Sequence, residues 1–242
     1  MDERLKNIVD NFDEYKIGLD DTFEFSCKQC GKCCINREDI LLNPEDIYRL
    51  CKELNLAPKD FIKEYCDAYL GESSRFPLVR LQPQGTVRRC RFLKNRKCSV
   101  HKAKPTVCAA FPIGRCVIWD KKQLQSADVD KVKIQYIHNK ADCGGEKETH
   151  TVRQWLEAFD IPAHDPFFIK WNRLLFKTGG IVSRAEKKLH EELLEIMWNT
   201  IYFMLYLNYD MEKDFMMQFE ENAKHIMEML ELLPTEMERR SA

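Results

Sequence analysis

The sequence predicts a mainly α-helical protein with one small β-hairpin, in which a cysteine-rich first domain precedes an antiparallel helical region. All eleven cysteines of the 242-residue chain lie between Cys27 and Cys143. Beyond Cys143, apolar side chains recur every three or four positions, which is the period of an amphipathic helix. We therefore predict a first domain at residues 1–150 and a helical C-terminal region at residues 151–242, where antiparallel helices bury their apolar faces.

Three helices are predicted in the first domain. The charged segment 2–12 has the apolar spacing of a short amphipathic helix. Asn43 and Pro44 indicate a helix start, because Asn caps unpaired N–H groups and Pro suits the first helical position. Pro58 opens the next helix, whose apolar positions continue to Leu70. All three are short helices, which suits a domain organised around loops.

A β-hairpin and four further helices complete the predicted secondary structure. Strand patterns at 76–82 and 86–93 flank the turn Pro83-Gln84-Gly85 and predict the hairpin. In the C-terminal region, Gly179-Gly180 is expected to end one helix and Ser183 to begin the next with a capping box. The four helices are predicted at 151–159, 166–177, 184–208 and 211–233.

The composition is typical of a soluble protein. Charged residues make up 32% of the chain and the net charge is −1, which argues against nucleic acid as a partner. No apolar run reaches the length of a membrane span, and the first residues lack the apolar core of a signal peptide. We therefore expect a cytoplasmic protein without a membrane partner, in which the cysteines stay reduced.

Four cysteines lie within eight residues, at Cys27, Cys30, Cys33 and Cys34. Small thiol side chains bury little apolar area, so packing does not explain this density, whereas thiolates bind soft metals. A CxxCxxC spacing lets successive thiolates surround one face of a cubane cluster. The adjacent pair Cys33-Cys34 would serve two different metal centres more naturally than one.

Downstream cysteines supply enough further thiolates for two four-cysteine sites. An odd total of eleven excludes a fully paired disulfide framework. Cys51 and Cys66 fall on apolar helix faces and are interpreted as core residues, whereas Cys116 is a possible ligand. One or two [4Fe–4S] clusters are the favoured cofactors, and Zn²⁺ is the alternative. The eight predicted metal ligands are Cys27, Cys30, Cys33, Cys34, Cys90, Cys98, Cys108 and Cys143.

The segment from Cys90 to Pro112 carries a recognisable pattern, CxFL, a short gap, and then CxxHxxxPxxCxxFP. With the first cysteine run and Cys143-Gly144-Gly145, it resembles the CxxCxxCC cysteine-cluster family of zinc- or iron-chelating proteins, which includes the flagellin N-methylases. The resemblance covers about residues 24–150. Val100 and Lys104 are conservative departures from the family pattern, whereas Ala109 stands where the family usually has Arg.

Three functions are open at this stage. The first is an iron–sulfur protein that transfers electrons or assists a redox enzyme, with that enzyme as its protein partner. The second, implied only by the resemblance, is an S-adenosylmethionine-dependent protein-lysine N-methyltransferase with a protein substrate. The third is a zinc-binding structural or interaction module. The sequence assigns no catalytic residue and leaves open whether the protein is an enzyme.

The stretch from Arg75 to Lys104 contains ten Lys or Arg residues and no Asp or Glu. Such a run can be a solvated face, can offset the negative charge of a thiolate-bound cluster, or can dock an acidic partner. His101 lies three residues after Cys98, where it can donate a hydrogen bond to a cluster sulfur or bind the metal itself. The first role is the expected one.

Overall fold

The computed structural model describes residues 10–28, 30–35, 40–72, 74–119, 132–139 and 148–239. Its fold is mixed α/β, with 49% helix, 19% strand and several small antiparallel sheets, and this corrects the prediction of a mainly α protein. Contacts group the chain into two compact units, each built from two separate segments. Unit 1 comprises Met1–Arg37 and Gly85–Asn172, and unit 2 comprises Glu38–Gln84 and Arg173–Ala242. The predicted division at residue 150 stays a prediction.

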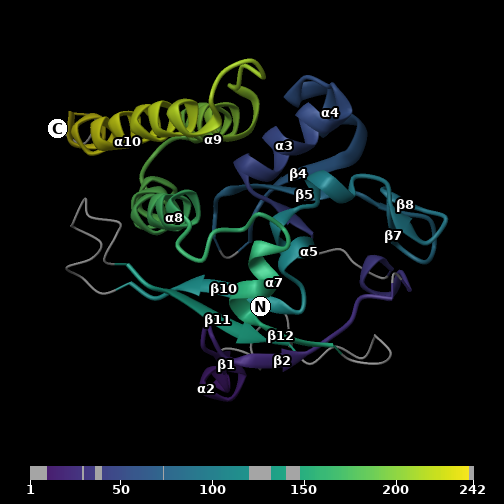
Figure 1. Cartoon of the computed structure of the whole chain (residues 1–242). Helices are drawn as coiled ribbons and strands as arrows, with labels where there is room; N and C mark the ends of the chain where they lie inside the picture. Colours follow the sequence, from purple (N-terminus) through teal and green to yellow (C-terminus); the bar gives the residue numbers. More distant parts are fainter. Residues whose placement is uncertain are drawn as a thin grey trace. The chain divides into compact units, whose positions relative to one another are not determined.

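Unit 1 is built on two small antiparallel sheets and a hairpin (Figure 1). In the larger sheet β11 lies between β1 and β10, in the smaller one β12 pairs with β2, and β8 pairs with β9 in the hairpin. The strands are β1 (Lys16–Ile17), β2 (Thr22–Glu24), β7 (Arg89–Cys90), β8 (Leu93–Lys94), β9 (Lys97–Cys98), β10 (Ile113–Val117), β11 (Ile134–His138) and β12 (Thr149–Thr151). The helices are α2 (Phe12–Tyr15), η1 (Lys32–Cys34), η2 (His101–Ala103), α5 (Thr106–Ala110) and α7 (Val152–Glu157). The predicted helix at 2–12 lies largely outside the described residues.

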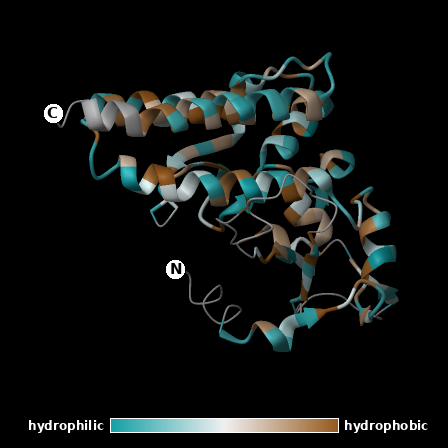
Figure 2. Ribbon diagram, turned by 90° about the vertical axis from the view of Figure 1, so that its left-hand side faces the viewer, coloured by the Kyte–Doolittle hydropathy of each residue, from teal (hydrophilic) through white to brown (hydrophobic). Residues whose placement is uncertain are grey.

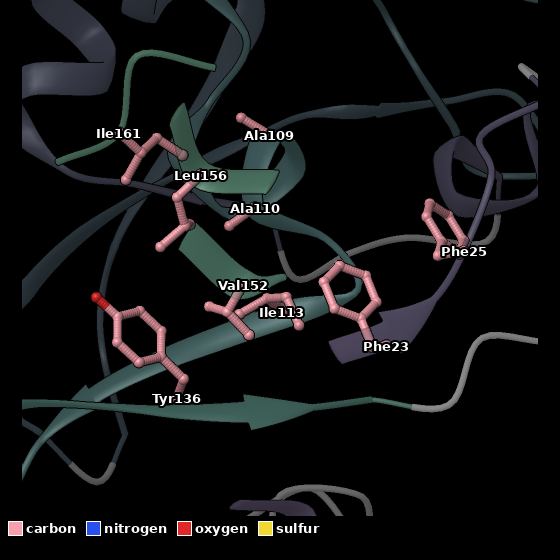
Figure 3. Packing of buried hydrophobic residues seen from close by; sticks show 9 residues of the cluster. All are labelled: Phe23, Phe25, Ala109, Ala110, Ile113, Tyr136, Val152, Leu156 and Ile161. Atoms are coloured by element: carbon pink, nitrogen blue, oxygen red, sulfur yellow. The ribbon is translucent and has the colours of Figure 1, made fainter. Parts of the chain in front are cut away.

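The core of unit 1 forms where α5 and α7 pack on the sheets. Val152 and Leu156 of α7 are completely buried and lie beside Ile113 and Tyr136 of the larger sheet (Figure 3). The ring of Phe25, just before the cysteine run, is also buried in this cluster. The segment that precedes the cysteines is therefore fixed by hydrophobic packing, which contributes about 1.5–3 kcal/mol for each large side chain that is buried.

A buried ion pair joins the larger sheet to the start of α8 (Pro166–Ala185), the long helix that follows α7. Arg115 of β10 donates from Nη1 to Asp165 Oδ2 at 2.8 Å, and the two side chains are only 5% and 9% exposed. The guanidinium also lies 4.3 Å from the ring centroid of Phe168. Asp165 Oδ1 accepts the Phe168 N–H at 2.9 Å, so one carboxylate both pairs a buried charge and caps the helix.

Unit 2 contains a three-stranded antiparallel sheet, with β5 between β3 and β4, and two short helices. These elements are β3 (Leu41–Leu42), α3 (Pro44–Leu54), α4 (Pro58–Tyr65), β4 (Cys66–Leu70), β5 (Pro77–Leu81) and β6 (Pro83–Gln84). The predicted start of α3 is confirmed, because the Asn43 side chain accepts the Asp46 N–H at 2.8 Å and Asp46 accepts the Asn43 N–H in return. This is a complete capping box.

Two sequence predictions for this region are wrong. The helix after Pro58 ends at Tyr65, and Cys66–Leu70 form strand β4 because they pair along their whole length with β5. The predicted hairpin between 76–82 and 86–93 is not formed, since β5 pairs with β3 and β4 instead. Residues 86–93 contribute the two-residue strand β7 and the start of β8, which pairs with β9.

The long helices of unit 2 also differ from their predicted bounds. Helix α8 continues through Gly179-Gly180 to Ala185, so Ser183 does not start a helix. Glu186, the other end of the expected capping box, instead accepts a hydrogen bond from Arg75 Nε at 2.7 Å. The remaining helices are α9 (Glu191–Tyr202), the π-helix η3 (Phe203–Leu207) and α10 (Phe215–Arg239). The predicted helix at 151–159 is confirmed as α7 with slightly shorter bounds.

Helices α9, η3 and α10 bury amphipathic faces in the core of unit 2. Leu194, Met197 and Ile201 are the buried residues of α9. Hydrophobic and hydrophilic residues alternate along α10, the helix that ends at the C-terminus (Figure 2). Fully buried Tyr206 of η3 donates its hydroxyl to the Pro77 carbonyl at 3.2 Å, which links the helices to the sheet. Among the described residues, no helix combines the length and apolar character needed to cross a membrane.

Candidate metal centre

Cys33 and Cys34 belong to a single turn of 3₁₀ helix, η1, in unit 1. Gly31 precedes this turn with φ of 75°, a left-handed conformation that glycine adopts without strain. The Cys34 N–H donates to the Gly31 carbonyl at 2.9 Å. This tight turn brings the two adjacent sulfurs to 3.8 Å from each other, so both thiols of the pair lie on the same side of the loop.

Cys90 and Cys98 are held by the short strands β7 and β9. Backbone N–H groups of Phe92 and Leu93 donate to the Cys90 sulfur, and that of Val100 donates to the Cys98 sulfur. The Ser99 N–H donates to the Phe92 carbonyl at 2.8 Å and closes the same loop. N–H groups directed at a sulfur stabilise its thiolate, which is the form that binds metal.

The third contribution comes from Cys108 in α5. The Cys108 N–H donates to the Pro105 carbonyl at 2.8 Å, which starts the helical turn. The adjacent Ala109 and Ala110 are buried in the core of unit 1. Trp155 of α7 donates its indole N–H to the Ala110 carbonyl at 3.0 Å. Core packing therefore fixes the position of the cysteine-bearing turn.

Five of the predicted ligands interact with one another through their charges. The hydrogen bond with Cys33 raises the pKa of the Cys34 thiol far above its ordinary value, and burial and the negative charges of Cys33, Cys90 and Cys108 raise it further. Burial raises the pKa of Cys90, and the charges of Cys98 and Cys33 add to the effect. Thus η1, the β7–β9 region and α5 bring together thiols that are far apart in the sequence.

The pKa of the Cys98 thiol is affected by contributions of opposite sign. Burial raises its pKa, whereas the Val100 N–H and the ammonium group of Lys104 lower it. Lys104 also lies 5.2 Å above the ring of Phe159, which fixes the position of this cation. His101, three residues after Cys98, has its ring centroid 6.1 Å from that of Phe159. Partial burial and the Lys104 charge both lower its pKa.

Besides this group of five interacting thiols, the candidate ligands are Cys27, Cys30, Cys116 and Cys143. Cys27 is exposed and Cys30 is partly buried, both in the segment before η1. Cys116 lies on β10, where burial raises its pKa. Cys143 lies outside the described residues, and the roles of all nine candidate ligands stay predictions. None of the ten described cysteines forms a disulfide, and within the described ranges no group of three or more His, Cys, Asp or Glu is close enough to hold a metal ion.

Cys51 and Cys66 lie in unit 2, whereas all the predicted ligands belong to the segments of unit 1. Cys51 is completely buried on α3, and Cys66 is 9% exposed at the start of β4. Burial raises the pKa of Cys51 to about 12. Their interpretation as core residues agrees with this burial.

The donor set near η1 fits a soft metal centre. The five interacting groups are thiols, and thiolate sulfur selects zinc, copper(I) or iron–sulfur clusters over the hard cations that prefer oxygen. Protonated thiols with raised pKa values become ligands when a metal replaces the proton, so metal binding would release protons from this site. The backbone N–H groups directed at Cys90 and Cys98 are the second-layer contacts that such sulfurs need.

Sequence reasoning missed the aromatic support of this site. Phe25 packs edge-on against both Phe111 and Trp155, with ring centroids 5.9 and 5.5 Å apart. Phe111 directly follows α5, so these rings join the segments that carry Cys27 and Cys108. The alternation of Phe23 and Phe25 before Cys27 is a strand pattern that could have indicated it.

Comparison with protein families agrees with this arrangement. Residues 26–144 match the family model CxxCxxCC, described as a putative zinc- or iron-chelating domain. No curated protein and no solved structure matches the chain. The matched segment contains every predicted ligand from Cys27 to Cys143 as well as the two core cysteines of unit 2. Residues 26–144 are therefore similar to the CxxCxxCC family of zinc- or iron-chelating domains.

Proposed function

We propose that the protein is an iron–sulfur protein that transfers electrons or serves a redox enzyme as its accessory. The observation that carries this proposal is the 3.8 Å approach of the Cys33 and Cys34 sulfurs. Cys90, Cys98 and Cys108 are partly buried, and the effects on thiol pKa values relate them to this pair. Cys33, Cys34, Cys90, Cys98 and Cys108 are the residues that would hold the cluster, with Cys27, Cys30 and Cys143 available to complete two sites. A bound [4Fe–4S] cluster would supply one-electron redox chemistry.

Two further features support a cluster over an isolated metal ion. Hydrogen bonds from backbone N–H groups to Cys90 and Cys98 are contacts that set the reduction potential of iron–sulfur clusters. Lys104 places a positive charge near Cys98, where it would offset the net negative charge of a thiolate-bound cluster. In this proposal the thiols would be the ligands of the redox centre, and Lys104 would compensate part of its charge.

Zinc is the second candidate because of the spacing within the adjacent pair. Zn–S bonds of about 2.3 Å in a tetrahedral site place neighbouring sulfurs about 3.8 Å apart, and the sulfurs of Cys33 and Cys34 are separated by 3.8 Å. On this reading both thiolates bind the same ion, and the metal stabilises unit 1 without redox chemistry.

Anaerobic purification followed by iron, acid-labile sulfide and zinc analysis separates the two candidates. An iron–sulfur protein contains iron and sulfide in equal amounts, absorbs near roughly 400 nm and gives an EPR signal in one redox state. Zinc without iron or sulfide would contradict the proposal and select the structural module. Absence of all three would contradict both candidates.

Paired cysteine variants test the ligand assignment. We expect Cys33→Ser and Cys98→Ser to lower the bound metal by at least half, because each removes a thiolate from the interacting group. Cys51→Ala is the matched control, since this thiol is completely buried in unit 2. Equal metal loss in the control and in the two ligand variants would overturn the assignment.

A further inference from the structure

The segment that carries Cys90 and Cys98 is strongly cationic. Between Gly85 and Lys104 the sequence has eight Lys or Arg residues and neither Asp nor Glu. Six of these cations are exposed, namely Arg88, Arg89, Lys94, Arg96, Lys97 and Lys102. The same segment contains the ligand candidates Cys90 and Cys98, so the cations are close in the sequence to two predicted ligands. Arg89 lies in β7, Lys94 in β8 and Lys97 in β9, and Figure 1 shows the backbone of the β7 and β8 region.

The β8–β9 hairpin contains cationic side chains at positions where they lower its own stability. Asn95 and Arg96 form its two-residue turn, with φ of 50° and 64°. Positive φ at both positions is the geometry of a type I′ turn, where glycine is favoured and a long side chain is strained. Lys94 and Lys97 are directly opposite each other in the register, and like charges in that position destabilise a hairpin.

Binding to a negatively charged partner would explain why the hairpin has Arg96 in its turn and Lys94 opposite Lys97. Strained conformations and unfavourable charge pairs persist where a function requires the side chain. A cationic surface attracts an acidic protein and orients it, and the attraction weakens as salt rises. Exposed Val87 and Val107, at 57% and 46%, lie in the chain beside Arg88 and Cys108 and offer the apolar contacts of a protein interface.

Nucleic acid fits this surface less well. Phe92 is the one Phe, Tyr or Trp between Gly85 and Lys104, and it is buried at 3% exposure, so it cannot stack on a base. The helical element within this segment is the three-residue η2, which is too short to enter a groove. The favoured partner is therefore a protein with an acidic surface.

We infer that the β7–β9 face of unit 1 is a docking surface for an acidic electron-carrier protein. This inference rests on the proposed redox function and names the class of partner for it. Lys94, Arg96 and Lys97 supply the charges at the turn. Cys98 follows Lys97 in β9, and Cys90 lies in β7, which precedes β8 in the chain. The docked carrier is thereby held next to the thiolates that would bind the cluster.

The test measures binding of the full chain to a fluorescently labelled acidic flavodoxin, a carrier that contains no iron. We expect the dissociation constant to rise at least about tenfold between about 20 mM and about 200 mM salt. Lys97→Glu should weaken binding at low salt at least about tenfold, yet raise Tm because it converts a like-charged cross-strand pair into an attractive one. Arg96→Gly should weaken binding roughly threefold or more without lowering Tm.

Asn95→Gly is the matched control, because it relieves the turn in the same way and keeps every charge. It should bind flavodoxin as tightly as the wild type. The docking surface would be overturned if the wild type did not bind flavodoxin, or if its affinity did not change with salt concentration. It would also be overturned if Lys97→Glu bound flavodoxin as tightly as the wild type. Tighter binding to a DNA duplex measured in parallel would overturn it in favour of nucleic acid.

Metal analysis of the same samples separates this inference from the proposed function. Iron-loaded protein that does not bind flavodoxin refutes the docking surface alone. Protein that binds flavodoxin with the expected salt dependence but contains no iron refutes the iron–sulfur proposal alone.

Discussion

Replacement of Cys51 by Ala should reverse its effect on stability between neutral and alkaline pH. Cys51 is completely buried on α3, and this burial raises its pKa from 9.0 to about 12. In the unfolded chain the thiol releases its proton near pH 9, whereas in the folded protein it keeps the proton until about pH 12. The folded state therefore loses stability as the pH rises from 9 to 12, and it keeps its full stability below pH 9.

The loss of stability depends on how far the pH lies above 9, the pKa of the Cys51 thiol in the unfolded chain. Each pH unit above 9 costs about 1.4 kcal/mol, so the buried thiol destabilises the wild type by about 2.7 kcal/mol at pH 11. At pH 7 the Cys51→Ala variant loses only the packing of one sulfur atom, about 1–2 kcal/mol. The variant is thus less stable than the wild type at pH 7 and more stable at pH 11.

Urea unfolding followed by circular dichroism at pH 7, 9, 10 and 11 measures both values. Both proteins are kept reduced and matched in metal content. Free energies of unfolding that stay parallel across this range would refute the reasoning, because they would show that the thiol ionises at the same pH in both states. Metal loss in the variant would instead show that Cys51 is a ligand and not a core residue.

Three further outcomes are expected. Asp165→Asn should lower the free energy of unfolding by about 3 kcal/mol in urea titrations, since it leaves buried Arg115 without a counter-charge; a loss below about 1 kcal/mol would contradict this. Asn43→Ala should cost about 1 kcal/mol by the same measurement, because it removes the cap of α3, and an unchanged midpoint would speak against the cap. In metal-free protein at pH 8, Cys34 should react with a disulfide reagent more slowly than exposed Cys27, because its raised pKa keeps it protonated; equal rates by peptide mapping would count against this.

Local signals made part of the fold predictable. The start of α3 was predictable from sequence because the capping residue Asn43 and the first-turn Pro44 adjoin the helix that they begin. By contrast, the apolar spacing of Cys66, Tyr69 and Leu70 is that of a helix, yet these residues form a strand. Pairing with β5 decides the matter, and that pairing depends on residues further along the chain. Similarly, Ser183 has the composition of a helix start, but the Glu186 N–H already bonds to the Val182 carbonyl within a continuing turn.

The candidate site, like the fold, could be predicted only in part from the sequence. Cysteine spacing was enough to predict candidate ligands, because metal ligation needs particular residue types at short intervals. The interaction of Cys34 with Cys90 and Cys108 arises from tertiary packing, which no local pattern encodes. The N–H groups that bond to Cys90 and Cys98 belong to the backbone, so side-chain identity does not reveal them.

The division of unit 1 into two segments has a consequence for biosynthesis. The ribosome synthesises the cysteine run at Cys27–Cys34 first, and then the α3–β6 segment of unit 2, before Cys90 is made. Core residues Val152 and Leu156 follow later still. The first thiols therefore leave the ribosome well before the segments that complete their surroundings. If these thiols bind a metal, its delivery to a finished site would wait until synthesis has passed α7, and loading would be a late event in the production of this protein.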